Sequence, residues 1–239
     1  MDTYSDHIKK EIEAIIAAYD VLVTGIDKKA QDSDTRAYGG IIRAGKGKLV
    51  ESTAWQLIEL AWNSLGESSK RIANIKSTIK SPINRDYLDR IEDDEIRDHI
   101  KKNIKDYYYP TKSDIHVYID KKFEIAVECK SFTENAMYKR IMVDFTLLKK
   151  TYPDLDFALV QLESQLGGDY SDLTTKIFGS TSTHTLTSFF DIDLDIITLL
   201  RGERKVQKPI HKKEYYKPLT KENLYAAIEI FKKILRKYK

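Results

Sequence analysis

Residues 113–130, SDIHVYIDKKFEIAVECK, alternate apolar and polar side chains over two short segments. Such alternation is typical of β-strands, because successive side chains point to opposite faces of a sheet. We therefore predict strands at 114–119 and 123–130, joined by a three-residue turn over 120–122. The face expected to be the core side carries Ile115, Val117, Ile119, Phe123, Ile125, Val127 and Cys129. The opposite, polar face is expected to carry Asp114, His116, Tyr118, Glu124, Glu128 and Lys130.

The turn sets the register of this hairpin. A three-residue turn places Asp114 directly opposite Glu128, with Lys130 one pleat further along the same face. Carboxylates on opposite residues of paired strands have Cβ atoms about 5 Å apart, close enough to share one hard cation. Mg²⁺ suits such a pair, because it takes few protein carboxylates and keeps its other positions for water and phosphate oxygens.

This polar face predicts metal-dependent hydrolysis of phosphodiester bonds, with the Lys130 ammonium orienting water or stabilising charge on the phosphate. The alternative is a structural hairpin with a solvated charged face, because 32% of the residues are charged. A Glu-x-Lys triplet alone is a weak signal, and a second one occurs at residues 203–205. That copy has no flanking apolar alternation, so we interpret it as a chance match or as part of a DNA-contacting loop.

Ser113-Asp114 followed by Glu128-Cys129-Lys130 resembles the PD-(D/E)XK motif of the restriction-endonuclease-like nucleases, with Ser113 in place of the variable proline. A helical stretch at 134–150 and an apolar strand at 156–163 continue an element order similar to that of type II restriction enzymes. The resemblance covers about residues 40–165. It implies an α/β fold with a central mixed sheet flanked by helices. It also implies that Asp114 and Glu128 bind the metal and that Lys130 is the catalytic lysine.

Residues 43–51, RAGKGKLVE, are similar to the Arg-Ala-Gly-Lys stretch that opens a helix with an additional active-site glutamate in some type II enzymes. The resemblance adds Glu51 to the catalytic set. Helical geometry over 48–65 places Glu51 among Trp55 and Ile58, where an unpaired carboxylate is costly. The alternative is a favourable interaction of Glu51 with the dipole at the start of the helix.

The glycine-punctuated lead-in to this helix carries three basic residues, Arg43, Lys46 and Lys48. Their side chains are candidates for contacts to phosphates or to guanine edges. A flexible, solvated loop is the alternative interpretation.

The net charge of +3 is unevenly distributed. Residues 201–239 hold thirteen Lys or Arg against four Glu, an excess of +9, so the first 200 residues carry −6. Basic residues interleaved with tyrosine over 205–217 are typical of a segment that follows a phosphate backbone, although a solvated basic loop has the same composition. We predict phosphate contacts here from three lysines, with two basic residues on the 134–150 helix as further candidates. These residues are Lys208, Lys212 and Lys213, and then Lys139 and Arg140.

With 239 residues the chain is long enough for one domain with a full core, and no Pro/Gly/Ser-rich linker divides it. We predict a single nuclease domain over 1–239. The single cysteine, Cys129, rules out an intrachain disulfide and favours a reducing compartment. No apolar run approaches the roughly 20 residues that a membrane helix needs. We expect a cytoplasmic protein that makes no membrane contact.

Hydrophobic periodicity predicts the remaining elements. Helices are expected at 3–20, 48–65, within 84–106, at 134–150 and at 220–237. Further strands are expected at 156–163 and 194–200, and loops at 27–40, 164–185 and 201–219. Tyr107-Tyr108-Tyr109 is expected to pack within the molecule, or else against DNA or a partner subunit.

These features favour a homodimeric type II restriction endonuclease that cuts both strands of duplex DNA with Mg²⁺. One catalytic set in a chain of this size cuts two strands most simply as a two-fold dimer on a symmetric site. Two alternatives stay open. One is another nuclease of the same superfamily, such as a repair nuclease or a junction resolvase, and the other is a non-catalytic DNA-binding module.

Overall fold

The computed structural model describes residues 4–31, 37–172, 176–210 and 212–239, and of residues 26–31 and 37–44 it describes the backbone alone. The strands are β1 (Ile72–Asn74), β2 (Ile79–Pro82), β3 (Tyr108–Thr111), β4 (Ile115–Ile119), β5 (Lys122–Glu134), β6 (Asp156–Gln165) and β7 (Leu194–Thr198). The helices are α1 (Asp6–Gln31), α2 (Ala37–Ser64), α3 (Arg85–Asp89), α4 (Asp94–Lys102), α5 (Asn135–Thr151), α6 (Thr181–Thr187) and α7 (Lys221–Leu235).

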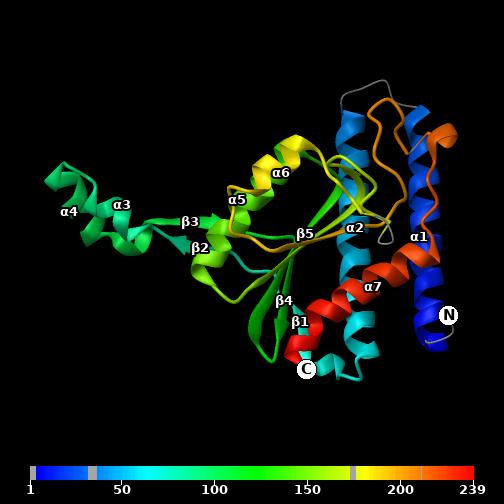
Figure 1. Cartoon of the computed structure of the whole chain (residues 1–239), viewed down its shortest axis with the longest axis horizontal. Coiled ribbons are helices and arrows are strands. Elements are labelled where there is room, and N and C mark those ends of the chain that lie inside the picture. Colours follow the sequence, from blue (N-terminus) through cyan, green and yellow to red (C-terminus); the bar gives the residue numbers. More distant parts are fainter. Residues whose placement is uncertain (1–3, 32–36, 173–175, 211) are drawn as a thin grey trace.

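Five of the strands form one mixed sheet in the order β1-β4-β5-β6-β7. β4 runs antiparallel to both β1 and β5, whereas β5, β6 and β7 are parallel to one another. The sheet thus changes from antiparallel to parallel at β5, the strand that carries the motif. The predicted mixed sheet flanked by helices is confirmed (Figure 1).

Helices cover both faces of this sheet. On one face α1, α2 and α7 enclose a large core that includes Ile115, Ile125 and Cys129. On the other face α5 packs on a second core that includes Phe157 and Leu159. Burial on both sides explains why β6 reads as a continuous apolar run instead of an alternating one. The alternative of a solvated charged face therefore does not hold for most of the hairpin, and His116, predicted on the polar face, is only 1% exposed.

The hairpin turn is shorter than predicted. Ile119 pairs with Lys122, which leaves a two-residue turn at Asp120 and Lys121. Both turn residues have positive φ, 48° and 69°, as a type I′ turn requires. The predicted three-residue turn is wrong, because the sequence has no glycine to reveal the left-handed positions.

A β-bulge restores the predicted register further along. Tyr118 pairs with Phe123 but Val117 pairs with Ile125, so Glu124 is an extra residue on β5. Beyond the bulge Ile115 pairs with Val127, as predicted. The bulge also reverses the side on which Phe123 lies. Phe123 belongs to the core under α5, not to the core face predicted for it.

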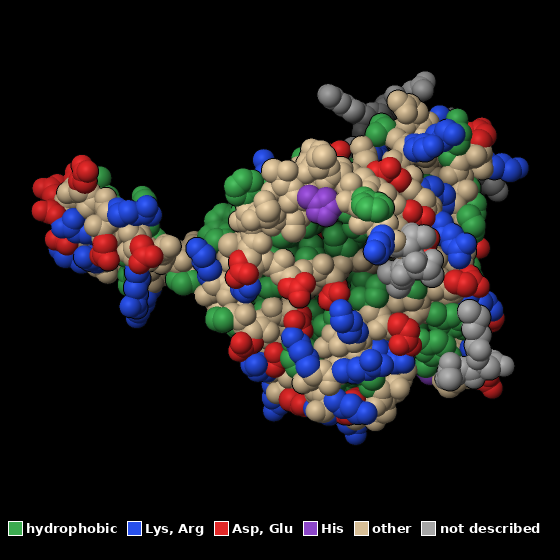
Figure 2. All heavy atoms as spheres, in the orientation of Figure 1, with side chains coloured by type: hydrophobic (Ala, Val, Ile, Leu, Met, Phe, Trp, Pro, Cys, Tyr) green, Lys and Arg blue, Asp and Glu red, His purple; other side chains and the backbone are tan. Residues whose placement is uncertain are grey.

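An arm projects from the body at β2 and β3, which form a separate two-stranded sheet (Figure 1). The arm carries α3 and α4 at its tip, where acidic and basic side chains are mixed (Figure 2). Residues 83–107 contain eight acidic and six basic residues, a net charge of −2. This charge does not favour contact with a phosphate backbone.

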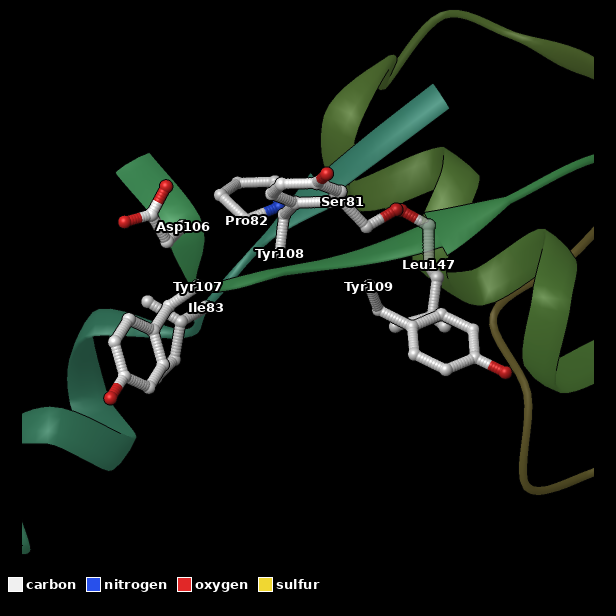
Figure 3. A pocket seen from close by; sticks show the side chains of 8 residues that line it. All are labelled: Ser81, Pro82, Ile83, Asp106, Tyr107, Tyr108, Tyr109 and Leu147. Carbon is white, nitrogen blue, oxygen red and sulfur yellow. The ribbon is translucent and has the colours of Figure 1, made fainter. Parts of the chain in front are cut away.

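The tyrosine run lies at the base of this arm, where Tyr108 and Tyr109 belong to β3. Together with Tyr107 they line a hollow of about 340 Å³ against Pro82 and Leu147 (Figure 3). Tyr109 is 60% exposed, so this side chain is not part of the core.

Several predicted boundaries are corrected by the structure. α1 reaches Gln31 and α2 already begins at Ala37, so the loop predicted at 27–40 is helical on both sides of residues 32–36, which lie outside the described residues. The helix predicted within 84–106 is two short helices. The loop predicted at 164–185 contains the start of α6. None of the described helices has the length and apolar character needed to cross a membrane.

Replacing Lys121 by glycine should stabilise the protein. The left-handed φ of 69° is strained for lysine and free for glycine, so we expect Lys121→Gly to raise the free energy of unfolding by about 0.5–1 kcal/mol. The matched control is Lys122→Gly, which places glycine inside β5 and should lower the free energy of unfolding. Urea denaturation of the three proteins measures both effects. Destabilisation by Lys121→Gly would contradict the turn geometry.

Candidate active site

The Asp114 side chain is fixed by the backbone of the neighbouring strand. The β4–β5 ladder ends at the pair Ile115 and Val127, whereas β5 continues to Glu134 beside β6. Past the end of β4 the N–H of Cys129 donates a hydrogen bond to Asp114 Oδ2 at 2.7 Å. A buried backbone N–H must find an acceptor, and here the acceptor is a side chain at the end of the strand. The local fold therefore dictates where this carboxylate lies.

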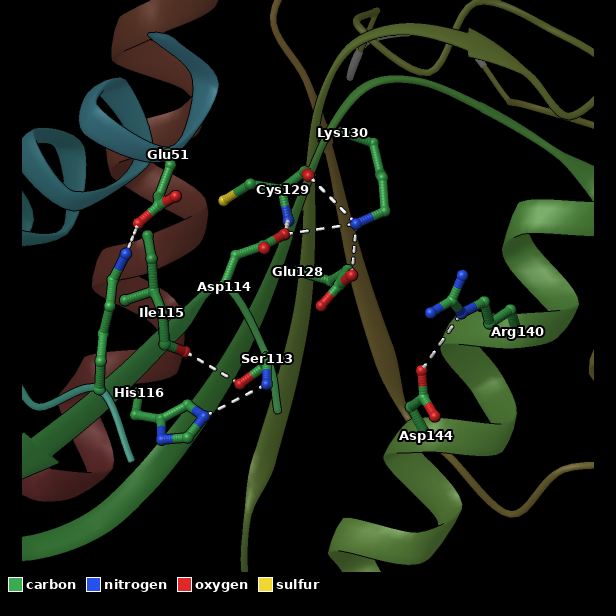
Figure 4. A network of polar contacts seen from close by, with 11 residues as sticks. Glu51, Ser113, Asp114, Ile115, His116, Glu128, Cys129, Lys130, Arg140 and Asp144 are labelled. Carbon is green, nitrogen blue, oxygen red and sulfur yellow. Dashed lines mark hydrogen bonds and ion pairs between the residues drawn. The ribbon is translucent and has the colours of Figure 1, made fainter. Parts of the chain in front are cut away.

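Three oxygen atoms surround the Lys130 ammonium (Figure 4). Asp114 Oδ2 and the carbonyl oxygen of Cys129 each lie 3.3 Å from Lys130 Nζ, and Glu128 Oε1 accepts a short hydrogen bond from it. The predicted set of Asp114, Glu128 and Lys130 is thus brought together at one point. All three side chains are partly exposed, at 35%, 18% and 28%, so the cluster is open to solvent on one side.

Burial and an excess of negative charge shape the electrostatics of the cluster. Burial raises the pKa of Glu128, and the Asp114 carboxylate raises it further, against the lowering effect of Lys130. Burial alone would lower the pKa of Lys130, but the carboxylates of Glu128 and Asp114 outweigh it and the pKa is raised. Lys130 is therefore protonated at neutral pH.

A further carboxylate, Asp144, faces the cluster from α5 (Figure 4). Burial raises the pKa of Asp144, while Arg140, 4.0 Å away, and Lys130 lower it. Asp144 in turn contributes to the raised pKa of Glu128. Asp144 was not predicted from the sequence, because no pattern distinguishes it from other charged residues of an amphipathic helix.

The predicted residue Glu51 lies beside the cluster on α2 and forms an ion pair with Lys76. Glu51 raises the pKa of Lys76, and Asp114 adds to this effect. Lys76 stands where two hollows meet, one of about 320 Å³ that reaches Asp114 and one of about 360 Å³ that reaches Lys48. Lys76 was also missed, since it lies in an irregular segment between two short strands without a motif.

The predicted DNA contacts lie in different surroundings. Lys46 is buried, and burial lowers its pKa against the raising effect of Glu163. A lead-in before a helix starting at residue 48 was predicted, but residues 45–48 are part of α2, and Lys46 is turned inward. The phosphate contact predicted for Lys46 is therefore not supported. The Arg43 side chain lies outside the described residues. The other predicted contacts are exposed: Lys48, Lys139, Arg140, Lys208, Lys212 and Lys213.

Comparison with known proteins identifies the class of enzyme. No model of a protein family matches the chain. The type II restriction enzyme DdeI of Desulfomicrobium norvegicum is 45% identical over 224 residues, which are 92% of this chain and 93% of that protein. The solved structure of the native BbvCI A2B2 tetramer at low resolution covers 98% of this chain and 90% of that chain, with 15% identity and a TM-score of 0.36. At that TM-score the likeness adds no support to the fold.

Identity of 45% over nearly the full length of both proteins shows that the chain belongs to the type II restriction enzymes. The protein is an endonuclease, as the motif predicted. The relationship favours this class over a repair nuclease, a junction resolvase or a non-catalytic DNA-binding module.

Removing the charge of Glu128 should stabilise the metal-free protein in a pH-dependent manner. A carboxyl group with a raised pKa in the folded state stabilises the fold below its unfolded pKa, about 4.3, and this contribution is lost as the pH rises through the folded value. The glutamine of Glu128→Gln does not ionise, so the variant loses no stability at this position over that pH range.

Its melting temperature in EDTA should therefore exceed that of the wild type at pH 8 and approach it at pH 4. The control Glu92→Gln, at an exposed glutamate on the arm, should show no such divergence. An advantage of Glu128→Gln that is equal at both pH values would refute this account.

Proposed function

We propose that this restriction enzyme is a homodimer that hydrolyses both strands of duplex DNA at a short symmetric site in an Mg²⁺-dependent reaction. Asp114 and Glu128 are the proposed metal ligands, Lys130 the catalytic lysine and Glu51 a supporting carboxylate. The whole chain, 1–239, is proposed to be one nuclease domain, with its catalytic core at about 40–165.

One observation carries this proposal, namely the three oxygen atoms that converge on Lys130 Nζ. The positively charged ammonium group stands in for a metal cation at this point. Its neighbours are two carboxylates and a carbonyl, the hard oxygen donors that Mg²⁺ prefers. Among the described residues no three His, Cys, Asp or Glu side chains form a metal-holding group. Mg²⁺ needs few protein ligands, because it retains water and phosphate oxygens in its shell.

When bound, Mg²⁺ supplies Lewis acidity that polarises the phosphoryl group. In the metal-free protein the carboxylates of Glu128 and Asp114 raise the pKa of Lys130, so its ammonium is protonated at neutral pH. The proposed role of Lys130 is to stabilise negative charge that develops on the phosphate and to orient water. Asp114, held by the N–H of Cys129, keeps its carboxylate aligned without relying on the cation.

Glu51 and Lys76 extend the site toward α2. Their ion pair lies next to Asp114, and both residues line the hollow that contains Lys48. Lys76 and Lys112 line the second hollow together with Asp114. Three lysines therefore flank the carboxylates, which supports a phosphate path across these two hollows.

We infer the homodimer from the number of proposed catalytic clusters in one chain. The described chain brings together one cluster of Asp114, Glu128 and Lys130, and the second Glu-x-Lys triplet forms no such site. Its Glu203 side chain accepts a hydrogen bond from Gly167 N at 3.0 Å and so stabilises a loop. Two chains related by a two-fold axis would place one cluster on each strand of a symmetric site.

The catalytic assignment predicts that Lys130→Ala abolishes DNA cleavage while Lys205→Ala does not. Both are lysines of a Glu-x-Lys triplet, but only Lys130 lies among the carboxylates. Incubation of a plasmid with Mg²⁺ should give discrete fragments for the wild type and for Lys205→Ala. EDTA should prevent cleavage. Sequencing the fragment ends gives the recognition site.

Glu128→Ala should be as inactive as Lys130→Ala, and the double variant barely worse, because residues that act as a unit are not additive. Activity of Lys130→Ala within threefold of the wild type, with Mg²⁺ present, would contradict the site assignment.

The basic segment 205–217 packs against α1, where Tyr19 donates a hydrogen bond to Lys217 O at 2.7 Å. Lys217 Nζ lies 2.8 Å from Glu163 Oε1, so this lysine points inward. Lys208, Lys212 and Lys213 are exposed. We propose that these three lysines contact phosphates.

Replacing Lys208, Lys212 and Lys213 by glutamine should weaken binding to all DNA sequences alike. It should also flatten the slope of log affinity against log salt by roughly 0.9 for each phosphate that is no longer neutralised. The matched control is the same replacement at Lys101, Lys102 and Lys105 on the arm, which removes equal charge from an exposed surface. Equal slopes for both triple variants would show that the segment makes no phosphate contact.

A further inference from the structure

An uncharged, hydroxyl-rich surface surrounds α6. Residues 177–190 contain no Asp, Glu, Lys or Arg, in a chain that is 32% charged, and they include seven Ser or Thr. In Figure 2 the surface over α6 is mainly tan and green around a histidine. Phe189, just after the helix, is 79% exposed. Such a surface lacks the positive charge that dominates binding to a phosphate backbone.

Four of the seven hydroxyls hold α6 in place. Thr183 Oγ1 is buried and bonds to Leu166 O at 2.9 Å and to Asn135 Oδ1 at 2.8 Å. Ser180 caps the helix, Thr187 bonds to Tyr138 on α5, and the hydroxyl of Ser188 donates to Thr185 O. α6 is therefore anchored on α5 by its own side chains.

The other three hydroxyls point outward. Thr181, Ser182 and Thr185 are exposed, and within the described chain their hydroxyls form no hydrogen bond. At 100° per residue they lie within about 100° of the helix circumference, opposite Thr183. All three line a hollow of about 500 Å³ between α5 and α6, together with Lys139 and Phe189.

This hollow lies at the active-site end of the sheet. Asn135, which holds Thr183, is the first residue of α5, directly after β5, and lies five residues beyond Lys130, roughly 16 Å at 3.3 Å per residue. That length equals about five base pairs of DNA at 3.4 Å each. A duplex that is cut at Lys130 and follows β5 toward α5 would have the base pairs of a short site within reach of α6.

We propose that the outward face of α6, with Lys139 and Phe189, reads base edges in the DNA groove next to the scissile phosphate. This inference rests on the proposed function. Free hydroxyl groups donate hydrogen bonds to base edges and accept hydrogen bonds from them. The lysine ammonium donates hydrogen bonds to guanine, and phenylalanine packs on the methyl group of thymine. Phosphate contacts alone carry no sequence information, so the residues that specify the site must reach base edges.

The test measures kcat/KM on duplexes that contain the enzyme's own site and on all its single base-pair variants, together with binding to a random duplex of equal length. Ser182→Ala/Thr185→Ala should reduce kcat/KM on its own site by at least about tenfold and lower discrimination at one or two positions. Affinity for the random duplex and its salt slope should stay unchanged. Thr185→Ser should retain activity, because it keeps the hydroxyl.

The matched control is Val21→Ala/Thr24→Ala, which removes one exposed apolar side chain and one exposed threonine from α1. Rates of the α6 variant within twofold of this control, or an equal loss on every duplex including the random one, would overturn the inference. Absence of sequence-specific cleavage by the wild type would instead refute the proposed function, and the inference with it.

Discussion

The hydrogen bond from the N–H of Cys129 to Asp114 is the interaction on which the site depends. It occurs where β5 loses its antiparallel neighbour but keeps its parallel one. The edge of a strand normally exposes unpaired backbone groups, which is a liability. Here that edge fixes one carboxylate, and the same strand supplies Glu128 and Lys130. The change from antiparallel to parallel pairing thus creates the position at which the candidate site is assembled.

The charges of the cluster are unfavourable for a feature that serves only to stabilise the fold. The carboxylates of Asp114 and Glu128 contact Lys130, and Asp144 lies close enough to raise the pKa of Glu128 further. Burial raises the pKa of Glu128, which means that its ionised form is destabilised in the folded protein. A sequence selected only for stability would have an uncharged residue in place of one of these carboxylates. Strain of this kind is expected at sites that bind a cation, where function opposes stability.

The sequence predicted which side chains of the hairpin come together better than it predicted the turn between the strands. Alternation located Asp114, Glu128 and Lys130 on one face, but the turn is one residue shorter and Glu124 is an inserted residue, so two errors cancelled at the site. Burial of His116 was missed because a charged or polar pattern does not reveal a second layer of helices. The arm was missed because its strands are short and contain proline, which weakens any strand signal. Lys76 and Asp144 reach the site only through tertiary packing, which one sequence does not fix.

The buried thiol of Cys129 gives this hairpin a built-in reporter. The side chain is 6% exposed, and burial raises the pKa of the thiol, so the reactive thiolate is scarce while the sheet is intact. Alkylation must therefore wait for a local opening that separates β5 from α2. The rate of labelling at this single cysteine therefore measures how often β5 opens locally. Hydrogen exchange reports the opening of backbone amides in the same way. Ligands that bind on β5 would lower the labelling rate of Cys129 without contacting its sulfur.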